Sequence, residues 1–501
     1  MRIRGVYKNI FASALPQIAN IIYNLILPSL LISTYGSEIN GLTTTVKQII
    51  SYVSLVGSGI AVATTQSLYK PVAQKDVKTV NGMLCASNKM FNHYGTVYLL
   101  IVGVIALIYP LFLKESLSYF EMVLLLCIMS VSGASEFFVV GRCRSLLYAH
   151  RKVYICTTVQ AVSIISSLVF AIVLVKAEAN IITVQVAVSS VYIFRALVLY
   201  IYTRVTYPEY RYFYRDKPIN KAVEKRNAAM LHQITGLIST GSQSIILSTM
   251  VGLQAVSVFA VYNVVFSGLQ SIFSNIITAI TPYFGKVVAE EDQDRLVKQF
   301  DFVECIFFAM ITVVFSVAGV MILPFVSLYT QGADICYIDN SMAALFLTFT
   351  LFNIARLPGQ AIINTKGHFK ETKSRAVIEA TLCVVLSIIF TLSYGRIGVL
   401  LGSAIAMGWR CFDIMIYANK RLMGRTCRKS LLRFGGAFIN IILMFLVGEF
   451  VNIHVETWTD WIFVALVCSV VSIILTGTQT YFLNKNTVRP IVQRLASTKR
   501  E

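Results

Sequence analysis

The sequence predicts an all-α protein that crosses a membrane with about 14 transmembrane helices. The first observation is composition: 56% of the 501 residues are hydrophobic, only 13% are charged, and the mean hydropathy is +0.71. A soluble chain carries roughly 25% charged residues. The second is that apolar stretches of membrane-spanning length recur along the whole chain. The third is an internal repeat, which indicates two related halves.

The apolar stretches each approach or exceed the ~20 residues that cross ~30 Å of hydrocarbon. The first is too long for the core of a cleavable signal and has no clear cleavage site, so we expect it to remain as an anchor. The predicted spans are 9–34, 40–67, 91–112, 118–140, 154–175, 180–203, 230–251, 255–281, 302–324, 338–363, 376–393, 396–417, 431–450 and 459–483.

The repeat aligns residues 14–76 with residues 230–292 without a gap. Because the copies are separated by an even number of spans, they insert in the same direction, which predicts two six-helix lobes around a central cavity. The predicted parts are a first lobe (1–203), a basic linker loop (204–229), a second lobe (230–421), and two extra helices with a tail (422–501). Identical pairs include Gln17/Gln233, Gly36/Gly252, Lys70/Lys286 and Asp76/Asp292.

The net charge of +19 is distributed unevenly along the chain, and this distribution predicts how the protein is oriented in the membrane. Thirty-six of the 43 Lys and Arg residues lie in or beside segments on one side, which predicts that both termini are cytoplasmic. Spread over many short loops, this charge does not form a nucleic-acid-binding patch, so we expect no nucleic-acid partner. The basic linker either lies on an anionic leaflet or is a solvated connection.

Polar residues follow one face of several predicted spans, and polar groups in a membrane are costly unless they meet water, substrate or other helices. The stripes predict a hydrated, substrate-binding cavity between the lobes; the alternative is that they join helices in a dry interior. The candidate lining residues are Gln17, Asn20, Asn24, Ser51, Gln233, Asn263, Ser267, Gln270, Asn353 and Gln360.

Four cations lie well inside predicted spans, away from the span ends, namely Lys47, Arg195, Arg356 and Arg410. They are candidates for binding an anionic substrate group, because guanidinium and ammonium groups suit phosphates. The alternative for the arginines is that they reach the membrane interface, or that Arg410 pairs with Asp413. Glu136 is the one carboxylate that we place well inside a span. It is a candidate coupling residue, although pairing with an arginine is the favoured interpretation.

The sequence offers no sign of catalysis. The ten cysteines form no CxxC pair, the five histidines show no ligand spacing, and no nucleophile set or phosphate-binding loop occurs. We therefore expect no metal site, no cofactor and no enzymatic activity.

Several segments resemble the polysaccharide-export family of lipid-linked oligosaccharide flippases, of the O-antigen type. They are Tyr35-Gly36-Ser37-Glu38-Ile39-Asn40-Gly41-Leu42, Leu55-Val56-Gly57-Ser58-Gly59-Ile60 followed by Lys70-Pro71-Val72-Ala73, Thr365-Lys366-Gly367-His368-Phe369-Lys370, and Gly395-Arg396-Ile397-Gly398-Val399-Leu400-Leu401-Gly402. That family belongs to the multidrug/oligosaccharidyl-lipid/polysaccharide (MOP) exporter superfamily.

The resemblance implies a flippase in the bacterial cytoplasmic membrane. It would move a polyprenyl pyrophosphate-linked oligosaccharide to the outer leaflet by alternating access, for surface polysaccharide synthesis. Membrane lipids, a polysaccharide polymerase and glycosyltransferases are the implied partners. The alternatives are a small-molecule or drug exporter of the same superfamily, a membrane glycan polymerase, and a non-transporting scaffold. The tiny predicted outer loops disfavour the polymerase.

Overall fold

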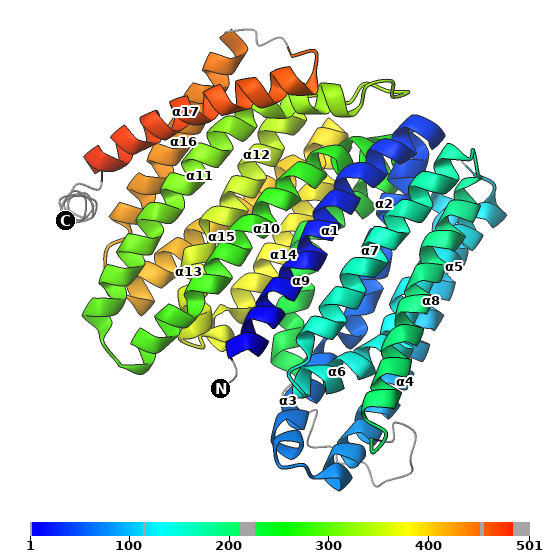
Figure 1. Ribbon diagram of the computed structural model, residues 1–501. Helices are drawn as coiled ribbons and strands as arrows, with labels where there is room; N and C mark the ends of the chain where they lie inside the picture. The colour runs from blue at the N-terminus through cyan, green and yellow to red at the C-terminus, as the bar shows by residue number, and fades with distance from the viewer. Residues whose placement is uncertain (1–2, 114–116, 211–225, 451–454, 484–501) are drawn as a thin grey trace. The chain divides into compact units, whose positions relative to one another are not determined.

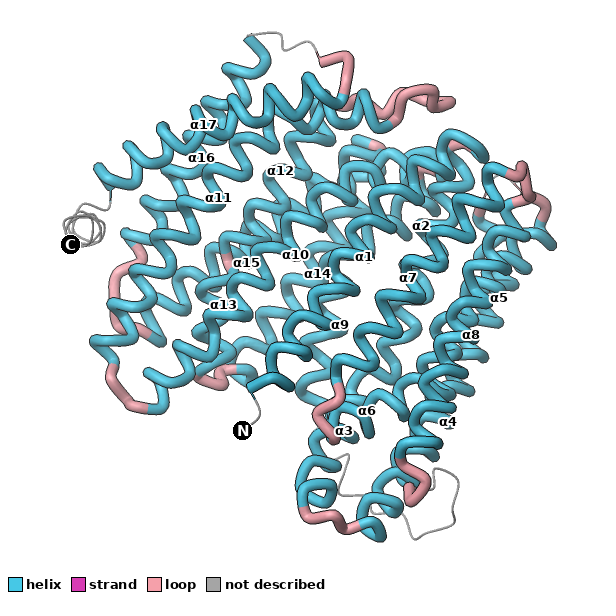
Figure 2. The backbone as a smooth tube through the Cα atoms, viewed as in Figure 1, coloured by secondary structure: helices cyan, strands magenta, loops and turns pink. Residues whose placement is uncertain are grey.

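The computed structural model describes residues 3–113, 117–210, 226–450 and 455–483, and within them it is helical with no strand (Figure 1, Figure 2). Twelve helices in these ranges are long and apolar enough to span a membrane. The predicted all-α polytopic fold is therefore confirmed. The described chain divides into two compact units, Met1–Ser257 and Val258–Glu501.

In the first unit, α1 packs along α7 and α2, α7 packs along α8, and α8 packs along α5. The shorter α3 contacts α4, α6 and α9. The helices of this unit are α1 (Ile3–Tyr35), α2 (Ser37–Ser54), α3 (Ser58–Ala73), α4 (Val77–Ile108), α5 (Tyr119–Ser135), α6 (Gly141–Ala149), α7 (Val153–Lys176), α8 (Ile181–Thr206) and α9 (Arg226–Met250).

In the second unit, α14 packs along α15, α12 packs against α15, and α11 is flanked by α16 and α17. Helix α10 begins at the end of the first unit and continues into the second. The helices are α10 (Leu253–Ala289), α11 (Gln293–Tyr329), α12 (Asn340–Ala355), α13 (Leu357–Thr365), α14 (Phe369–Tyr394), α15 (Arg396–Tyr417), α16 (Arg428–Phe450) and α17 (Trp458–Leu483).

Two predicted spans are interrupted. Residues 40–67 divide into α2, a 3-10 turn at Leu55–Gly57, and α3. Residues 338–363 divide into α12 and α13 at Arg356, with Pro358 in the first turn of α13. Proline is tolerated there because its missing N–H would have no partner inside the helix. By contrast, Pro16 and Pro28 lie inside a continuous α1.

The repeat seen in the sequence is also a repeat of local structure. Gly36 and Gly252 both adopt a positive φ, 84° and 131°, immediately before α2 and α10. Asp76 and Asp292 cap the next helices, where their side chains accept hydrogen bonds from the amides of Thr79 and Arg295. The helix boundaries therefore recur at the spacing of the aligned residues.

The two copies differ at one buried position. A Cβ on Gly57 would lie 2.0 Å from Cε1 of Phe137, so only glycine fits beneath that ring. The aligned residue in the second copy is Phe273, which is 1% exposed and packs edge-on against Phe307, with ring centroids 5.4 Å apart. Helix α10 continues through this point, whereas the first copy breaks into α2 and α3.

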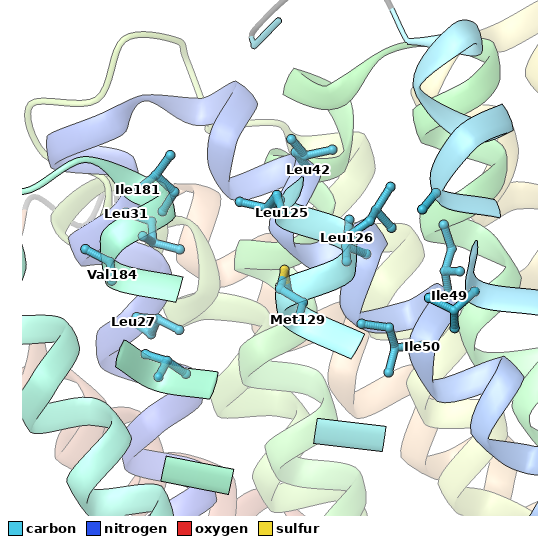
Figure 3. Close-up of a cluster of buried hydrophobic side chains, with 14 of the residues drawn as sticks. Leu27, Leu31, Leu42, Ile49, Ile50, Leu125, Leu126, Met129, Ile181 and Val184 are labelled. Carbon is cyan, nitrogen blue, oxygen red and sulfur yellow. The ribbon is translucent and has the colours of Figure 1, made fainter. Parts of the chain in front are cut away.

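The first unit is held by an aliphatic core (Figure 3). Leu27 and Leu31 of α1, with Leu42 of α2, are at most 2% exposed. Between helices in a membrane such side chains stabilise the unit by close van der Waals packing, since lipid is as apolar as leucine. The labelled members of this cluster are Leu27, Leu31, Leu42, Ile49, Ile50, Leu125, Leu126, Met129, Ile181 and Val184.

Candidate functional site

Lys47 is the predicted cation that the structure leaves accessible. It is exposed on α2, and its Nζ lies 5.2 Å from the ring centroid of Tyr23 on α1. Ion pairs in the described part of the chain involve other basic residues, and none joins Lys47 to a carboxylate. A lysine above an aromatic face keeps its charge available to an incoming anion.

The polar residues predicted on neighbouring faces of the first unit have mixed environments. On α1, Gln17 and Asn24 are exposed and Asn20 is half-buried. On α2, one turn from Lys47, Ser51 is half-buried. Gln233 falls in α9, but its side chain lies outside the described part of the structure.

Arg195 and Glu136 lie close together in the first unit. Glu136 begins a π-helical turn, Glu136–Val140, between α5 and α6. Its carboxylate pairs with Arg144 at 2.7 Å and, more distantly, with Arg195 of α8 at 4.0 Å. Arg144 is therefore the nearer partner of this carboxylate. Glu136, Arg144 and Arg195 together carry one net positive charge.

Arg356 and Arg410 share a carboxylate in the second unit. Glu379 of α14 accepts from Arg356 Nη1 at 2.9 Å, and its other oxygen lies 3.1 Å from Arg410 Nε. Arg410 also donates to Asp413 at 2.7 Å, one turn along α15. The side chains of Arg410 and Glu379 are 3% and 7% exposed, so this pairing lies in the interior of the unit.

The cluster extends beyond the two predicted arginines. Arg375 pairs with Asp413 and lies over the ring of Tyr417, 4.8 Å from its centroid. Asn353 Oδ1 accepts from Arg356 Nη2 at 2.8 Å, which fixes the guanidinium at the break between α12 and α13. Three arginines against two carboxylates leave one net positive charge here as well.

The remaining predicted residues of the second unit line one helix face or bond locally. On α10, Asn263 is exposed, and Ser267 and Gln270 are half-buried. On α13, Gln360 donates to Asn364 at 2.9 Å. Asn353 is 1% exposed, which is the environment of a structural amide.

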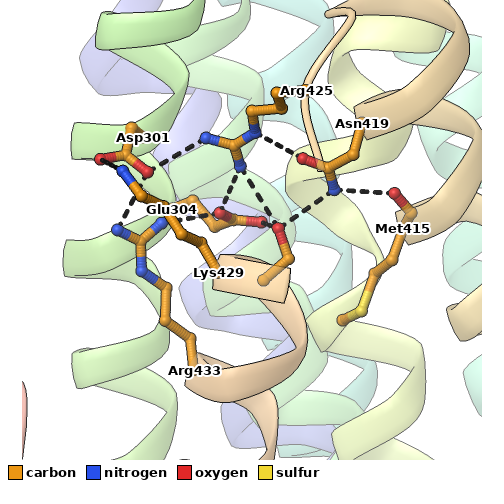
Figure 4. A network of polar contacts seen from close by, with 8 residues as sticks. Asp301, Glu304, Met415, Asn419, Arg425, Lys429 and Arg433 are labelled. Atoms are coloured by element: carbon orange, nitrogen blue, oxygen red, sulfur yellow. Dashed lines mark hydrogen bonds and ion pairs between the residues drawn. The ribbon is translucent and has the colours of Figure 1, made fainter. Parts of the chain in front are cut away.

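A second buried network joins α11 to the start of α16 (Figure 4). Glu304 accepts from Arg425 at 2.8 Å and from Arg433 at 2.7 Å. Asp301 pairs with Arg425 at 3.0 Å and with Arg433 at 3.1 Å. Because both carboxylates are occupied by guanidiniums, we interpret this network as a structural attachment of the added helices.

The sequence argument missed several carboxylates. Glu379 lies near the start of predicted span 376–393, and Glu304 near the start of 302–324. Both are buried in the structure, 5% and 3% exposed, which their place near the ends of the predicted spans did not indicate. The available signal was that α11 and α14 continue with polar residues well beyond their apolar segments. The described residues contain no group of three or more His, Cys, Asp or Glu that could hold a metal ion.

The chain resembles known proteins in structure and not in sequence. No protein-family model and no curated protein sequence matches the chain. Among solved structures, the lipid II flippase MurJ in an inward closed conformation is 13% identical with a TM-score of 0.69, over 94% of this chain and 98% of that chain. An inward-facing multidrug resistance MATE family transporter is 14% identical with a TM-score of 0.63, over 82% and 97%.

A third similar structure is a MOP superfamily transporter from Pyrococcus furiosus, described as having a binding pocket of reversed polarity. It is 13% identical with a TM-score of 0.57, over 84% of this chain and 96% of that chain. These structures are of transporters and a flippase. With twelve apolar helices among its described residues, the chain is an integral multi-pass membrane protein with the fold of MOP superfamily transporters.

Proposed function

We propose that this protein is a flippase that moves a lipid-linked oligosaccharide from the cytoplasmic to the outer leaflet of the bacterial cytoplasmic membrane. The observation that carries the proposal is Lys47, an accessible lysine with no carboxylate partner in the described chain, on a polar helix face. The fold adds support, since a lipid II flippase resembles the chain over 94% of its length.

The charges of the two units favour an anionic substrate. Lys47 is a mobile point charge suited to a pyrophosphate oxygen. In the cluster of Arg356, Arg375 and Arg410, the two carboxylates Glu379 and Asp413 hold the guanidiniums in place and leave one excess positive charge. The exposed amides of Gln17, Asn24 and Asn263 are then available to hydrogen-bond sugar hydroxyls.

A small-molecule exporter is the second candidate, favoured by the likeness to the MATE family transporter. An acidic side chain is the direct partner for a cationic drug, because a charge that leaves water needs an opposite charge. The predicted spans 9–34, 40–67, 230–251 and 255–281 contain no Asp or Glu, which favours the anionic substrate.

The test compares the leaflet location of polyprenyl-linked oligosaccharide in cells lacking the protein and in cells that express variants. We expect cytoplasmic-side accumulation that the wild type reverses and Lys47→Ala does not. Loss of one charge-assisted hydrogen bond of about 1.5–3 kcal/mol predicts a flipping rate roughly 10- to 100-fold lower. Lys47→Arg should restore most of the rate because it keeps the charge.

Lys176→Ala is the matched control, since Lys176 is an exposed basic residue at the end of α7 in the same unit. It should behave as the wild type does. If cells lacking the protein do not accumulate the lipid, or if Lys47→Ala flips at the wild-type rate with normal expression, the proposal is wrong and small-molecule export becomes the better hypothesis.

A further inference from the structure

A groove between α7 and α8 contains a guanidinium whose charge and hydrogen-bond donors are only partly paired with other groups of the protein. The groove has a volume of about 550 Å³ and is formed by these two helices alone. Arg195 lies in its wall with 13% of its side chain exposed. The Nε of Arg195 is buried and has no hydrogen-bond partner among the described residues.

The neighbouring carboxylate does not fully neutralise this group. Glu136 is 2.7 Å from Arg144 but 4.0 Å from Arg195, so Arg144 makes the shorter contact. A buried donor without an acceptor is costly, and a buried charge needs a partner. Arg195 therefore retains charge for an anionic ligand in the groove through the exposed part of its side chain, although its buried Nε is not itself accessible.

The rest of the groove is suited to a hydrocarbon chain. Val162, Phe170 and Phe194 line it and are 57%, 48% and 67% exposed. Near them, Ser163 donates its hydroxyl hydrogen to its own helix backbone, which leaves the oxygen free to accept. One polar wall with an otherwise apolar lining is the arrangement of a site for an amphiphile.

The position of the groove along the helices favours a lipid whose phosphate lies toward the membrane interface. Thr158 at one end of the groove is about 8 Å from the start of α7, and Arg195 is about 17 Å from the end of α8, at 1.5 Å per residue. An arginine about three turns from a helix end can extend toward the interface and meet a lipid phosphate. The groove volume fits a single acyl chain, whereas a long polyprenyl chain needs more room.

We infer that the α7–α8 groove is a binding site for an anionic glycerophospholipid, with its phosphate on Arg195 and one acyl chain along Val162, Phe170 and Phe194. The site lies within the first unit and uses no residue of the proposed Lys47 site. Lipid binding here is independent of whether the protein is a flippase.

The test is native mass spectrometry of the purified full chain titrated with phosphatidylglycerol, phosphatidylcholine and polyprenyl phosphate. We expect the wild type to bind phosphatidylglycerol more tightly than phosphatidylcholine. Arg195→Gln should lower the phosphatidylglycerol affinity about tenfold, as expected for one charge-assisted contact. Val162→Trp, which fills the groove, should weaken both phospholipids.

Two control variants match these changes. Arg204→Gln removes a cation from the same helix, and Ile165→Trp enlarges an exposed side chain of α7 that does not line the groove. Both should bind lipid as the wild type does. The inference would be overturned if Arg204→Gln and Arg195→Gln lost phosphatidylglycerol affinity equally, or if Val162→Trp bound both phospholipids as the wild type does. If Arg195→Gln weakens the binding of polyprenyl phosphate alone, the inference is also wrong, and the groove is a site for the polyprenyl carrier lipid.

Discussion

At the scale of single residues, the structure distinguishes basic residues held by carboxylates from basic residues, such as Lys47, for which no ion pair is seen among the described residues. Arg425 and Arg433 illustrate the first class, since both contact Asp301 and Glu304 in the interior of the second unit. Lys47 belongs to the second class. Because a buried ion pair needs both partners, the first class is sensitive to removal of a single carboxylate, whereas Lys47 can be changed without leaving a charge uncompensated.

Glu304→Gln should therefore destabilise the protein strongly. It leaves two guanidiniums with one carboxylate, and breaking a buried pair costs about 3–5 kcal/mol. We expect a clearly lower midpoint of thermal unfolding in detergent. Glu371→Gln is the control, because Glu371 is an exposed carboxylate of the same unit. Unfolding of Glu304→Gln at the wild-type temperature would show that the network of Figure 4 contributes little to stability.

At the scale of elements, helix starts are determined locally and recur in both copies of the repeat. Asp76 and Asp292 each cap a helix that begins at the next residue. Hydrogen bonds from the side chain and the amide of Thr79 lower the pKa of Asp76 below its usual value. Since the folded pKa lies below the unfolded one, this cap stabilises α4 fully above the unfolded pKa, and the contribution is lost as the pH falls through the folded pKa.

We accordingly expect hydrogen exchange in the first turn of α4 to become faster, relative to its intrinsic rate, when the pH is lowered through the folded pKa of Asp76. Asp76→Asn keeps a capping oxygen but does not titrate, so protection in this variant should not depend on pH. If the wild type and Asp76→Asn show the same pH dependence, the effect does not arise from the cap.

The helices also show how much of the fold can be predicted from the sequence. All fourteen predicted spans fall on helices, because a span needs a long apolar segment and such segments can be recognised in the sequence. Two of them, 40–67 and 230–251, are not among the twelve described helices that are long and apolar enough to cross a membrane. The break at Arg356 follows from Pro358. The 3-10 turn at Leu55–Gly57 was not predicted, because it lies beneath the Phe137 ring, which comes from a distant helix.

The candidate site was predicted less completely for the same reason. Arg195, Arg356 and Arg410 stand out in the sequence as charges in apolar segments. The sequence suggested the pairing of Arg410 with Asp413 and of Glu136 with an arginine, which the structure also contains. Glu379 comes from another helix, so its pairing with Arg356 depends on packing and could not be predicted from hydropathy.

At the scale of the whole molecule, orientation in the membrane is the next property to establish. The charge distribution predicts that the segment between α11 and α12 faces outward and that the segment between α15 and α16 faces the cytoplasm. Two native cysteines report on these segments. Cys336 is exposed in the first, and Cys427 is partly exposed in the second.

A membrane-impermeant maleimide applied to spheroplasts should label the wild type, and the labelling should be reduced in Cys336→Ser but not in Cys427→Ser. Reaction at Cys427 should require permeabilised membranes. Loss of labelling in Cys427→Ser alone, in sealed spheroplasts, would mean that the predicted orientation is reversed.

Gly57 and Phe273 have a consequence for the exchange of sequence between the two halves. A side chain at position 57 would collide with the ring of Phe137, whereas the second half places the ring of Phe273 at the aligned position against Phe307. The two halves are therefore not interchangeable here: a segment copied from the second half into the first would carry a ring into space that is already filled. A chimaeric protein that joins the halves across this position should fold less well than one joined in a loop.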